Sequence, residues 1–317
     1  MTKRAMGNLV NRYRSVLKKC HLINTFGSLA VAAILVMGVT DGEAFSNAVG
    51  YNVTSTSTPG TTVSVTDTSE NAVASGIKAE TSATYSVPST ITRAEATAIG
   101  KQSALSLGVF AQSSSGNRLT VNLAPLDISS TAVTENGTSR SVGIYSDVNS
   151  SVSAHGGTIV SSAHSKNGIG EAFGAMSQNN SSVTLGADTI VASSESSKHL
   201  SDPRSVGIYF SDNSTFNVTS NRIRVDVSAT HNGDVFSRKV NGIYGDKNST
   251  LTMNDADISV REINSTPDKS GAAGIHLFTA STLAMKDASI RVAAVDHEGT
   301  FAGSAIGIVT SPTSGRH

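Results

Sequence analysis

VGIYSDVNSSVSAHGGTI, at residues 142–159, returns as VGIYFSDNSTFNVTSNRI at residues 206–223 and as NGIYGDKNSTLTMNDADI at residues 241–258. Each copy has a glycine as its second residue, and we count positions from that glycine. Six clear copies and, upstream, two weaker ones are found 31 to 35 residues apart, anchored on Gly76, Gly108, Gly143, Gly174, Gly207, Gly242, Gly274 and Gly307. Such a period predicts a repeat architecture.

The copies agree position by position. Position six is asparagine in four consecutive copies, namely Asn149, Asn180, Asn213 and Asn248, and becomes Ala280 in the next. Two small hydroxyl residues follow it, and positions nine and eleven are apolar. Position sixteen is assigned to an isoleucine in five copies: Ile159, Ile190, Ile223, Ile258 and Ile290. On this alignment, insertions and deletions fall only after position sixteen.

Each copy contains three short stretches in which apolar and polar residues alternate, and this period of two is typical of strands. A single copy has no second face to bury, so neighbouring copies have to stack on one another. We therefore predict an all-β fold, a right-handed parallel β-helix with about 31–35 residues per coil. The handedness follows from the general preference of parallel crossovers.

The asparagine series predicts a tight corner, because asparagine tolerates the left-handed conformation. Stacked asparagine side chains could also form a hydrogen-bonded ladder along the axis, or asparagine could serve here as an ordinary turn residue. The variable segments after position sixteen, such as residues 199–204 and 232–239, are expected to be loops along one edge, where binding is common.

Tyr145, Tyr209 and Tyr244 share position two, with Met176 and His276 at the same position in intervening copies. They form a surface stripe if the strand alternates regularly through the glycine. They form an inner stack if the glycine marks a bulge.

The first 48 residues resemble a cleaved secretory signal. A basic segment at residues 3–19 precedes an apolar run at residues 29–39, and cleavage is expected after Ala44 or Ala48. The alternative, an uncleaved membrane anchor, needs about 20 apolar residues. Residues 49–107 are predicted to form an N-terminal cap and irregular first coils, with a strand at 61–68 and a helical segment at 90–102. Residues 108–317 are predicted to form the solenoid, incomplete at its C-terminus.

Composition restricts the function classes. The chain has 317 residues, of which 38% are hydrophobic, 5% aromatic and 15% charged, with a formal net charge of zero. Beyond residue 48 there are 24 − 6 = 18 basic and 24 − 2 = 22 acidic residues. A mildly acidic body with no basic stripe argues against a nucleic-acid partner. Cys20 is the only cysteine, so a mature chain would have no disulfide and no thiolate metal site.

Candidate catalytic and metal residues are few. The sequence has no nucleophile-elbow, zinc-protease or phosphate-loop motif, and His155 and His164 lack helical ligand spacing. Asp255 and Asp287 both occupy position thirteen of neighbouring coils, about 5 Å apart if the strands pair in register. A retaining glycosidase uses two carboxylates near that separation, but the ordinary interpretation is a pair of solvated turn residues. The carboxylates beside the asparagine corners are expected to cap turns, with calcium binding as the alternative, and are Asp147, Asp212 and Asp246.

A long basic signal, a body without cysteine and a Ser/Thr/Asn/Gly-rich β-helix together resemble the passenger of a type V autotransporter of the pertactin-like kind. The resemblance rests on organisation, and it includes the extended signal RYRSVLKKCHLINTFGSLAVAAILVMG. In that family a C-terminal transmembrane β-barrel follows the passenger, and residues 1–317 contain no such sequence pattern.

The resemblance implies Sec export and display at the cell surface and outer membrane when the passenger is joined to a translocator barrel, and otherwise a periplasmic location. We expect a non-enzymatic rod for adhesion, biofilm formation or self-association, with a host surface or neighbouring bacterial cells as partners. No catalytic residue, cofactor or metal site is predicted. The alternatives are a polysaccharide-active β-helix enzyme and a truncated, non-functional remnant.

Overall fold

The computed structural model describes residues 47–55, 60–114, 117–196, 204–231, 240–264, 271–296, 298–300 and 303–310. The predicted signal, except for its last two residues, and the predicted loop at 232–239 lie outside this part of the chain. The chain separates into the units Met1–Phe45 and Ser46–His317, and the second unit is described below.

The described residues form twenty strands and no helix, and every strand pairs in parallel with its neighbours. The strands belong to three walls. The glycine wall contains the repeat glycines and consists of β1 (Asn47–Asn52), β3 (Asn71–Ala79), β6 (Ser103–Gln112), the ends of β8 (Asp127–Asp147) and β10 (Thr158–Ser177), β13 (Arg204–Phe210), β16 (Val240–Gly245), β18 (Gly271–Leu277) and β20 (Ser304–Thr310).

The short wall follows it along the chain and consists of β4 (Thr84–Ser86), β7 (Leu119–Leu123), β9 (Ser150–Ala154), β11 (Ser182–Leu185), β14 (Thr215–Val218) and the starts of β17 (Thr250–Asn264) and β19 (Thr282–Val295). The isoleucine wall closes each coil and consists of β2 (Thr62–Asp67), β5 (Arg93–Gly100), the starts of β8 and β10, β12 (Thr189–Ser196), β15 (Arg222–His231) and the ends of β17 and β19.

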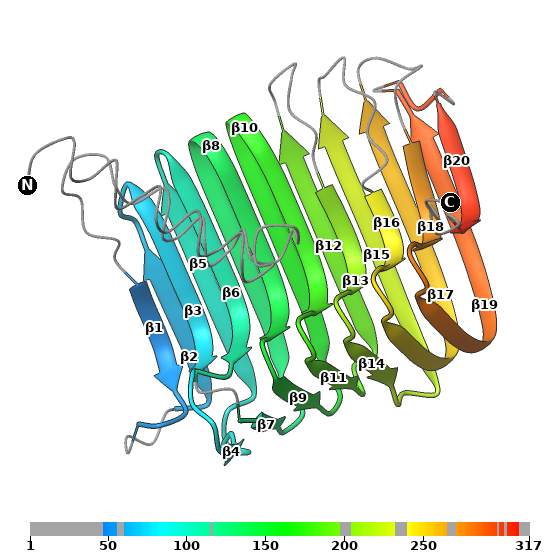
Figure 1. Cartoon of the computed structure of the whole chain (residues 1–317). Coiled ribbons are helices and arrows are strands. Elements are labelled where there is room, and N and C mark those ends of the chain that lie inside the picture. Colours follow the sequence, from blue (N-terminus) through cyan, green and yellow to red (C-terminus); the bar gives the residue numbers. More distant parts are fainter. Residues whose placement is uncertain are drawn as a thin grey trace, which may run out of the picture. The chain divides into compact units, whose positions relative to one another are not determined.

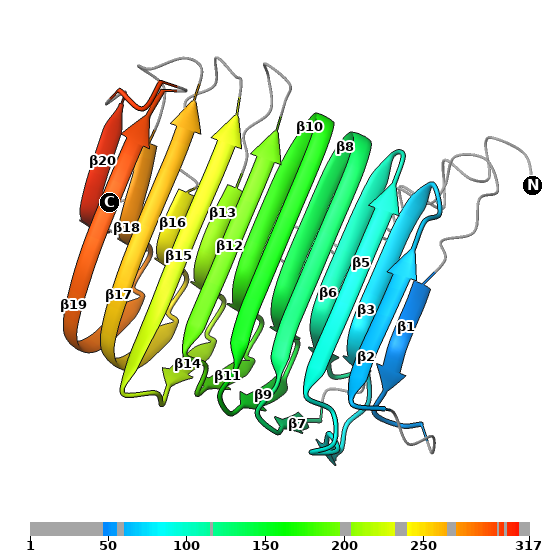
Figure 2. The ribbon, with the colours of Figure 1, turned by 180° about the vertical axis from the view of Figure 1, so that it is seen from behind.

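The coils stack in chain order, with β1 at one end and β20 at the other (Figures 1 and 2). The seven strands of the short wall correspond to seven complete three-walled turns. The predicted parallel β-helix is therefore confirmed.

The glycines form a ladder that brings opposite walls into contact. A Cβ atom added to Gly143 would lie 2.3 Å from Cγ2 of Ile159 on the isoleucine wall and 2.4 Å from the carbonyl oxygen of Gly174 in the next coil. Real Cβ atoms do not approach other atoms so closely. The same two kinds of contact recur at five further glycines: Gly108, Gly174, Gly207, Gly242 and Gly274. Gly50 belongs to the ladder too, because its strand pairs with β3 in the register that places it beside Gly76.

The space beside each ladder glycine, which we call the notch, is filled by one residue of the isoleucine wall. The identity of that residue explains position sixteen and corrects one assignment. Ile159, Ile190 and Ile258, which were assigned to position sixteen, each meet the glycine of their own coil. In the coil of Gly207 the notch is filled by Val225, and Ile190 pairs with Val225. Ile223 instead pairs with Ala256. Two extra residues therefore precede the notch residue in this coil, so insertions are not confined to later positions.

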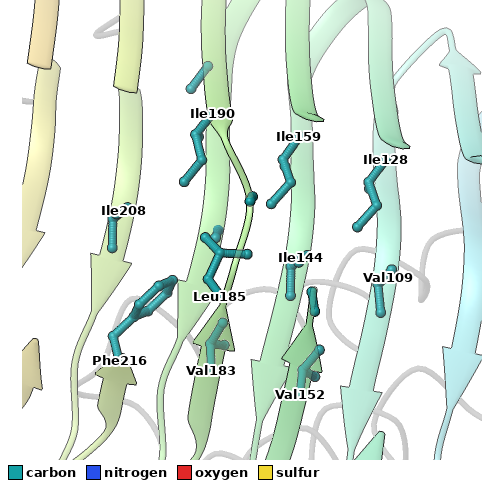
Figure 3. Packing of buried hydrophobic residues seen from close by; sticks show 14 of the residues in the cluster. Val109, Ile128, Ile144, Val152, Ile159, Val183, Leu185, Ile190, Ile208 and Phe216 are labelled. Atoms are coloured by element: carbon teal, nitrogen blue, oxygen red, sulfur yellow. The ribbon is translucent and has the colours of Figure 1, made fainter. Parts of the chain in front are cut away.

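The inner core consists of rows of mostly aliphatic side chains running along the axis, with a few rings such as Phe216 (Figure 3). Ile128, Ile159 and Ile190 form one such row on the isoleucine wall, and Val109 and Ile144 lie on the facing glycine wall. Four of these five are at most 1% exposed, and Ile128 is 2% exposed. The narrow interior needs few large rings, which agrees with the low aromatic content.

The corner between the glycine wall and the short wall is made by two successive residues with positive φ. Asn179 and Asn180 have φ of 56° and 60°, and Asn213 has 59°, which confirms the left-handed corner. The buried serine after each asparagine joins the coils, because Ser181 Oγ donates to the carbonyl of Ser146 at 2.8 Å. Ser150 and Ser214 make the same bond one coil earlier and later. Stacking of the asparagine side chains themselves stays a prediction.

The first coils follow the same plan, and one prediction there is wrong. The predicted strand at 61–68 is confirmed as β2, which pairs with β5. The segment 90–102, predicted to be helical, contains strand β5. Its alanines at 94, 96 and 98 face the interior and are at most 1% exposed, so packing between walls outweighs the helix preference of alanine and glutamate.

Candidate interaction surface

A second apolar cluster lies on the opposite face of the glycine wall from the inner core. Gly143 and Ile144 both face the interior, and Val142 and Tyr145 on either side of them belong to a separate cluster. We call this the outer cluster; it consists of Leu107, Phe110, Val142, Tyr145, Phe173, Met176, Val206 and Tyr209, with Leu105 and Tyr244 packed against it. The tyrosine stripe is thus an outer stripe, and its first members are buried within this cluster.

The rings of the outer cluster follow one another along the solenoid. Tyr209 and Tyr244 are stacked, with centroids 5.4 Å apart and planes 4° apart. Phe110 packs against Tyr145 at 5.6 Å, and Tyr244 meets the ring of His276 edge-on at 5.3 Å. The last ring of the series, Phe278, contacts His276 at 5.9 Å and is 40% exposed.

Polar groups border the outer cluster on the side of the corner. The Tyr145 hydroxyl donates to Oδ2 of Asp147 at 2.9 Å and accepts from the amide of Gln178. Burial raises the pKa of Tyr145 well above its ordinary value, and the Asp147 charge adds to the effect. Burial also raises the pKa of Asp147, although bonds from Asn179 and Tyr145 act against it. Burial raises the pKa of Tyr209 to about 12.

A row of charges borders the other side. Arg140 Nε donates to Oε2 of Glu171 at 2.7 Å, and Arg204 Nη1 lies 3.8 Å from Oε1 of the same carboxylate. Burial acts to lower the pKa of Arg140, but the charge and hydrogen bonds of Glu171 prevail and raise it. The outer cluster therefore has hydrogen-bonded polar borders on both sides of an apolar strip.

The structure brings the predicted carboxylate pair together. Asp255 and Asp287 are register partners on β17 and β19. Beside them, Arg222 makes two bonds of 2.6 Å to Asp257. These bonds and the charge of Asp257 raise the pKa of Arg222, with smaller contributions from the charges of Asp255 and Asp287. Asp287 is exposed within β19, and its Oδ1 accepts the backbone N–H of the next residue, Ala288, at 2.8 Å. The glycosidase interpretation stays a hypothesis.

Of the three corner aspartates, Asp147 makes the contact expected of a turn-capping residue, Asp212 forms an ion pair with the next coil, and Asp246 is partly buried, which raises its pKa. Asp147 Oδ1 accepts the Val148 amide at 2.9 Å and the Asn179 side chain at 2.6 Å, and Asp212 pairs with Lys247 at 3.2 Å. His164 lies 3.0 Å from Glu195, and His155 bonds to Ser153. Within the described part of the chain, no three His, Cys, Asp or Glu side chains gather closely enough to hold a metal ion.

Sequence reasoning found the tyrosines of the outer cluster but missed its second row. Val142, Phe173 and Val206 precede the glycine by one residue. Their alternation with the glycine was a usable signal, because an apolar residue on the face opposite the glycine cannot belong to the inner core.

No protein-family model, curated protein or solved structure matches this chain. Among the described residues, no helix is long and apolar enough to span a bilayer.

Proposed function

We propose that the solenoid is the N-terminal passenger region of an autotransporter, a surface-displayed, non-enzymatic rod that mediates adhesion, biofilm formation or self-association. The resemblance of residues 1–48 to an extended export signal supports export, and the repeated coils support an extended structural role. The partner is a host surface or a neighbouring bacterial cell, reached when the passenger is attached to a translocator barrel.

The outer cluster is the observation that carries this proposal. The solenoid already has a continuous hydrophobic core inside its three walls, so the apolar residues outside the glycine wall are not needed to fill it. The eight residues of the outer cluster are at most 7% exposed, and the strip becomes accessible at Tyr244, His276 and Phe278. An accessible apolar strip with polar borders is typical of an interaction surface. The exposed Phe278 continues the strip at its C-terminal end.

The test is display of the full chain ahead of a heterologous outer-membrane barrel. Surface accessibility to an antibody establishes export, and the rate at which cells settle reports self-association. We expect the wild type to settle faster than cells displaying the barrel alone, and Tyr244→Lys, at the rim of the outer cluster, to abolish the difference. Ser259→Lys is the matched control, because Ser259 is exposed on the isoleucine wall. Equal settling of the wild type and the barrel alone, together with equal binding to host cells, would refute the adhesive role.

The N-terminus of the exported protein gives a separate check on the signal. Cleavage after Ala48 would remove two residues from β1, of which Ala48 pairs with Ala74. Cleavage after Ala44 leaves the strand whole. We therefore expect N-terminal sequencing to find Phe45 as the first residue, and a protein that still begins at residue 1 after export would contradict a cleaved signal.

The second candidate function is polysaccharide cleavage at Asp255 and Asp287, favoured only by their pairing in register. Release of reducing ends from acidic and neutral polysaccharides tests it directly. Activity that disappears in both Asp255→Asn and Asp287→Asn would replace the non-enzymatic proposal.

A further inference from the structure

The accessible end of the outer strip is made by four side chains from two neighbouring coils. Positions two and four are Tyr244 and Asp246 in one coil and His276 and Phe278 in the next. The rings of Tyr244 and His276 are 5.3 Å apart, and those of His276 and Phe278 are 5.9 Å apart. Asp246 lies one rung from Phe278, because Gly245 pairs with the residue before Phe278. Phe278 is 40% exposed and the other three are partly exposed. We call these four residues the end patch.

An earlier coil contains the same tyrosine–aspartate pair in a closed form. Tyr145 and Asp147 occupy positions two and four there, and both are at most 3% exposed. Both oxygens of the Asp147 carboxylate accept hydrogen bonds. Oδ2 accepts from the Tyr145 hydroxyl at 2.9 Å, and Oδ1 accepts from the Asn179 side chain of the next coil at 2.6 Å. A buried carboxylate at position four is therefore surrounded by donors from its own coil and from the next.

Asp246 lacks such a set of donors. The next coil supplies Phe278 at position four, and a phenyl ring donates no hydrogen bond. Oδ1 of Asp246 is shielded from solvent and has no hydrogen-bond partner in the described part of the chain. Burial raises the pKa of Asp246, although a bond from Thr279 and the charge of Lys247 act against it. Lys247 is itself paired with Asp212 at 3.2 Å. The negative charge of Asp246 is therefore incompletely compensated.

The rings beside Asp246 add a preference for one kind of cation. Burial and the charge of Asp246 together raise the pKa of Tyr244, so the carboxylate and this ring are close. The faces of aromatic rings attract cations, and the guanidinium of arginine is the commonest of these in proteins. A guanidinium also presents several donors in a planar fork that fits a carboxylate, and it is more weakly hydrated than an ammonium group.

We propose that the end patch binds an arginine side chain of a protein partner, with the guanidinium paired to Asp246 and lying against the rings of Tyr244 and Phe278. This inference rests on the proposed adhesive role and names the chemistry of the partner. The apolar rings supply contact area, and the single charged pair orients the partner on the strip.

Binding of short labelled peptides to the purified full chain tests the site, with fluorescence anisotropy as the readout. The probes are a tri-arginine peptide and a tri-citrulline peptide, in which the side chains have nearly the same shape but no charge. We expect tri-arginine to bind at least about tenfold more tightly. Asp246→Asn removes the charge and keeps the shape, so it should weaken tri-arginine binding at least about fivefold.

Two further variants make the test specific. Phe278→Leu keeps an apolar side chain but removes a ring that is already exposed, so the protein should fold and bind tri-arginine about two- to threefold more weakly. Asp287→Asn is the matched control, because it makes the same change of charge at an exposed position of β19 outside the end patch, and binding should be unchanged. Equal binding of the two peptides, or equal losses in Asp246→Asn and Asp287→Asn, would overturn the proposal.

The settling of cells that display the chain separates this inference from the adhesive role. A purified chain that binds no tri-arginine, while cells displaying it still settle, would overturn the arginine site alone. Tri-arginine binding that depends on Asp246, without settling or binding to host cells, would support the site and refute the adhesive role.

Discussion

Substitution of a ladder glycine tests whether the close approach of the opposite walls depends on the missing side chain. In Gly143→Ala the new methyl group would lie 2.3 Å from Ile159 Cγ2 and 2.4 Å from the Gly174 carbonyl oxygen, where ordinary contact begins at 3.4 Å. Overpacking of this kind costs about 1–3 kcal/mol or more. Because alanine lowers the conformational entropy of the unfolded chain, the same substitution also stabilises the folded state by about 0.4–1 kcal/mol. We therefore expect a net loss of about 2 kcal/mol in the free energy of unfolding.

The repeat supplies its own control. Gly307 occupies the same position in the last coil, and a Cβ atom there would meet nothing within 4 Å. Gly307→Ala should leave stability unchanged or raise it by up to about 1 kcal/mol. Urea unfolding followed by circular dichroism should therefore separate the two variants by about 1 M in midpoint. The double variant Gly143→Ala/Ile159→Ala should remain destabilised, because the backbone oxygen of Gly174 cannot move aside. Equal midpoints for Gly143→Ala and Gly307→Ala would refute the steric explanation of the ladder.

Three further predictions concern the corner, the outer cluster and the core. Ala280 has a φ of 58° where other coils have asparagine. Ala280→Asn should therefore raise the free energy of unfolding by about 1 kcal/mol, and Asn213→Ala should lower it by a similar amount, as measured by urea unfolding. Burial raises the pKa of Tyr209 to about 12, so stability present below about pH 10 should decline as pH rises toward 12, and urea midpoints measured between about pH 9 and 11 should fall less in Tyr209→Phe. Phe216 is 0% exposed, and Phe216→Ala should cost about 3–5 kcal/mol in the same unfolding assay, whereas a loss below about 1 kcal/mol would mean that the interior collapses around the cavity.

The regular spacing of Gly143, Gly174 and Gly207 was sufficient to predict stacked coils. Short strands that repeat at a fixed period bury their apolar side chains by stacking on the neighbouring copies. The helical prediction for residues 90–102 failed for a different reason. Alanine and glutamate favour a helix locally, and sequence alone does not show that small side chains are needed where two walls approach closely. Ile223 was assigned to position sixteen because it is an isoleucine sixteen residues after Gly207. In the structure, the residue that contacts Gly207 from the isoleucine wall is Val225.

The candidate sites, like the fold, could be predicted only in part from the sequence. The outer position of Tyr145 could not be decided from alternation, because Gly143 and Ile144 face the interior together. The pairing of Asp255 with Asp287 followed from the repeat and was predicted. The buried Glu262 was missed because the copies were aligned only as far as position sixteen. At position twenty the copies contain Ala163, Ser194, Val227, Glu262 and Ala294, so the glutamate could have been recognised as an exception.

The extra pair of residues in the coil of Gly207 bears on how such a chain can diverge over generations. Either isoleucine or valine can fill the notch beside a ladder glycine. A coil can therefore gain two residues at a corner and still place an aliphatic side chain against its glycine. An even number of added residues preserves the alternation of inward and outward side chains, and an odd number reverses it. Lineages of this protein should therefore accumulate length changes at the corners, and lose or gain whole coils, while the glycines themselves stay fixed.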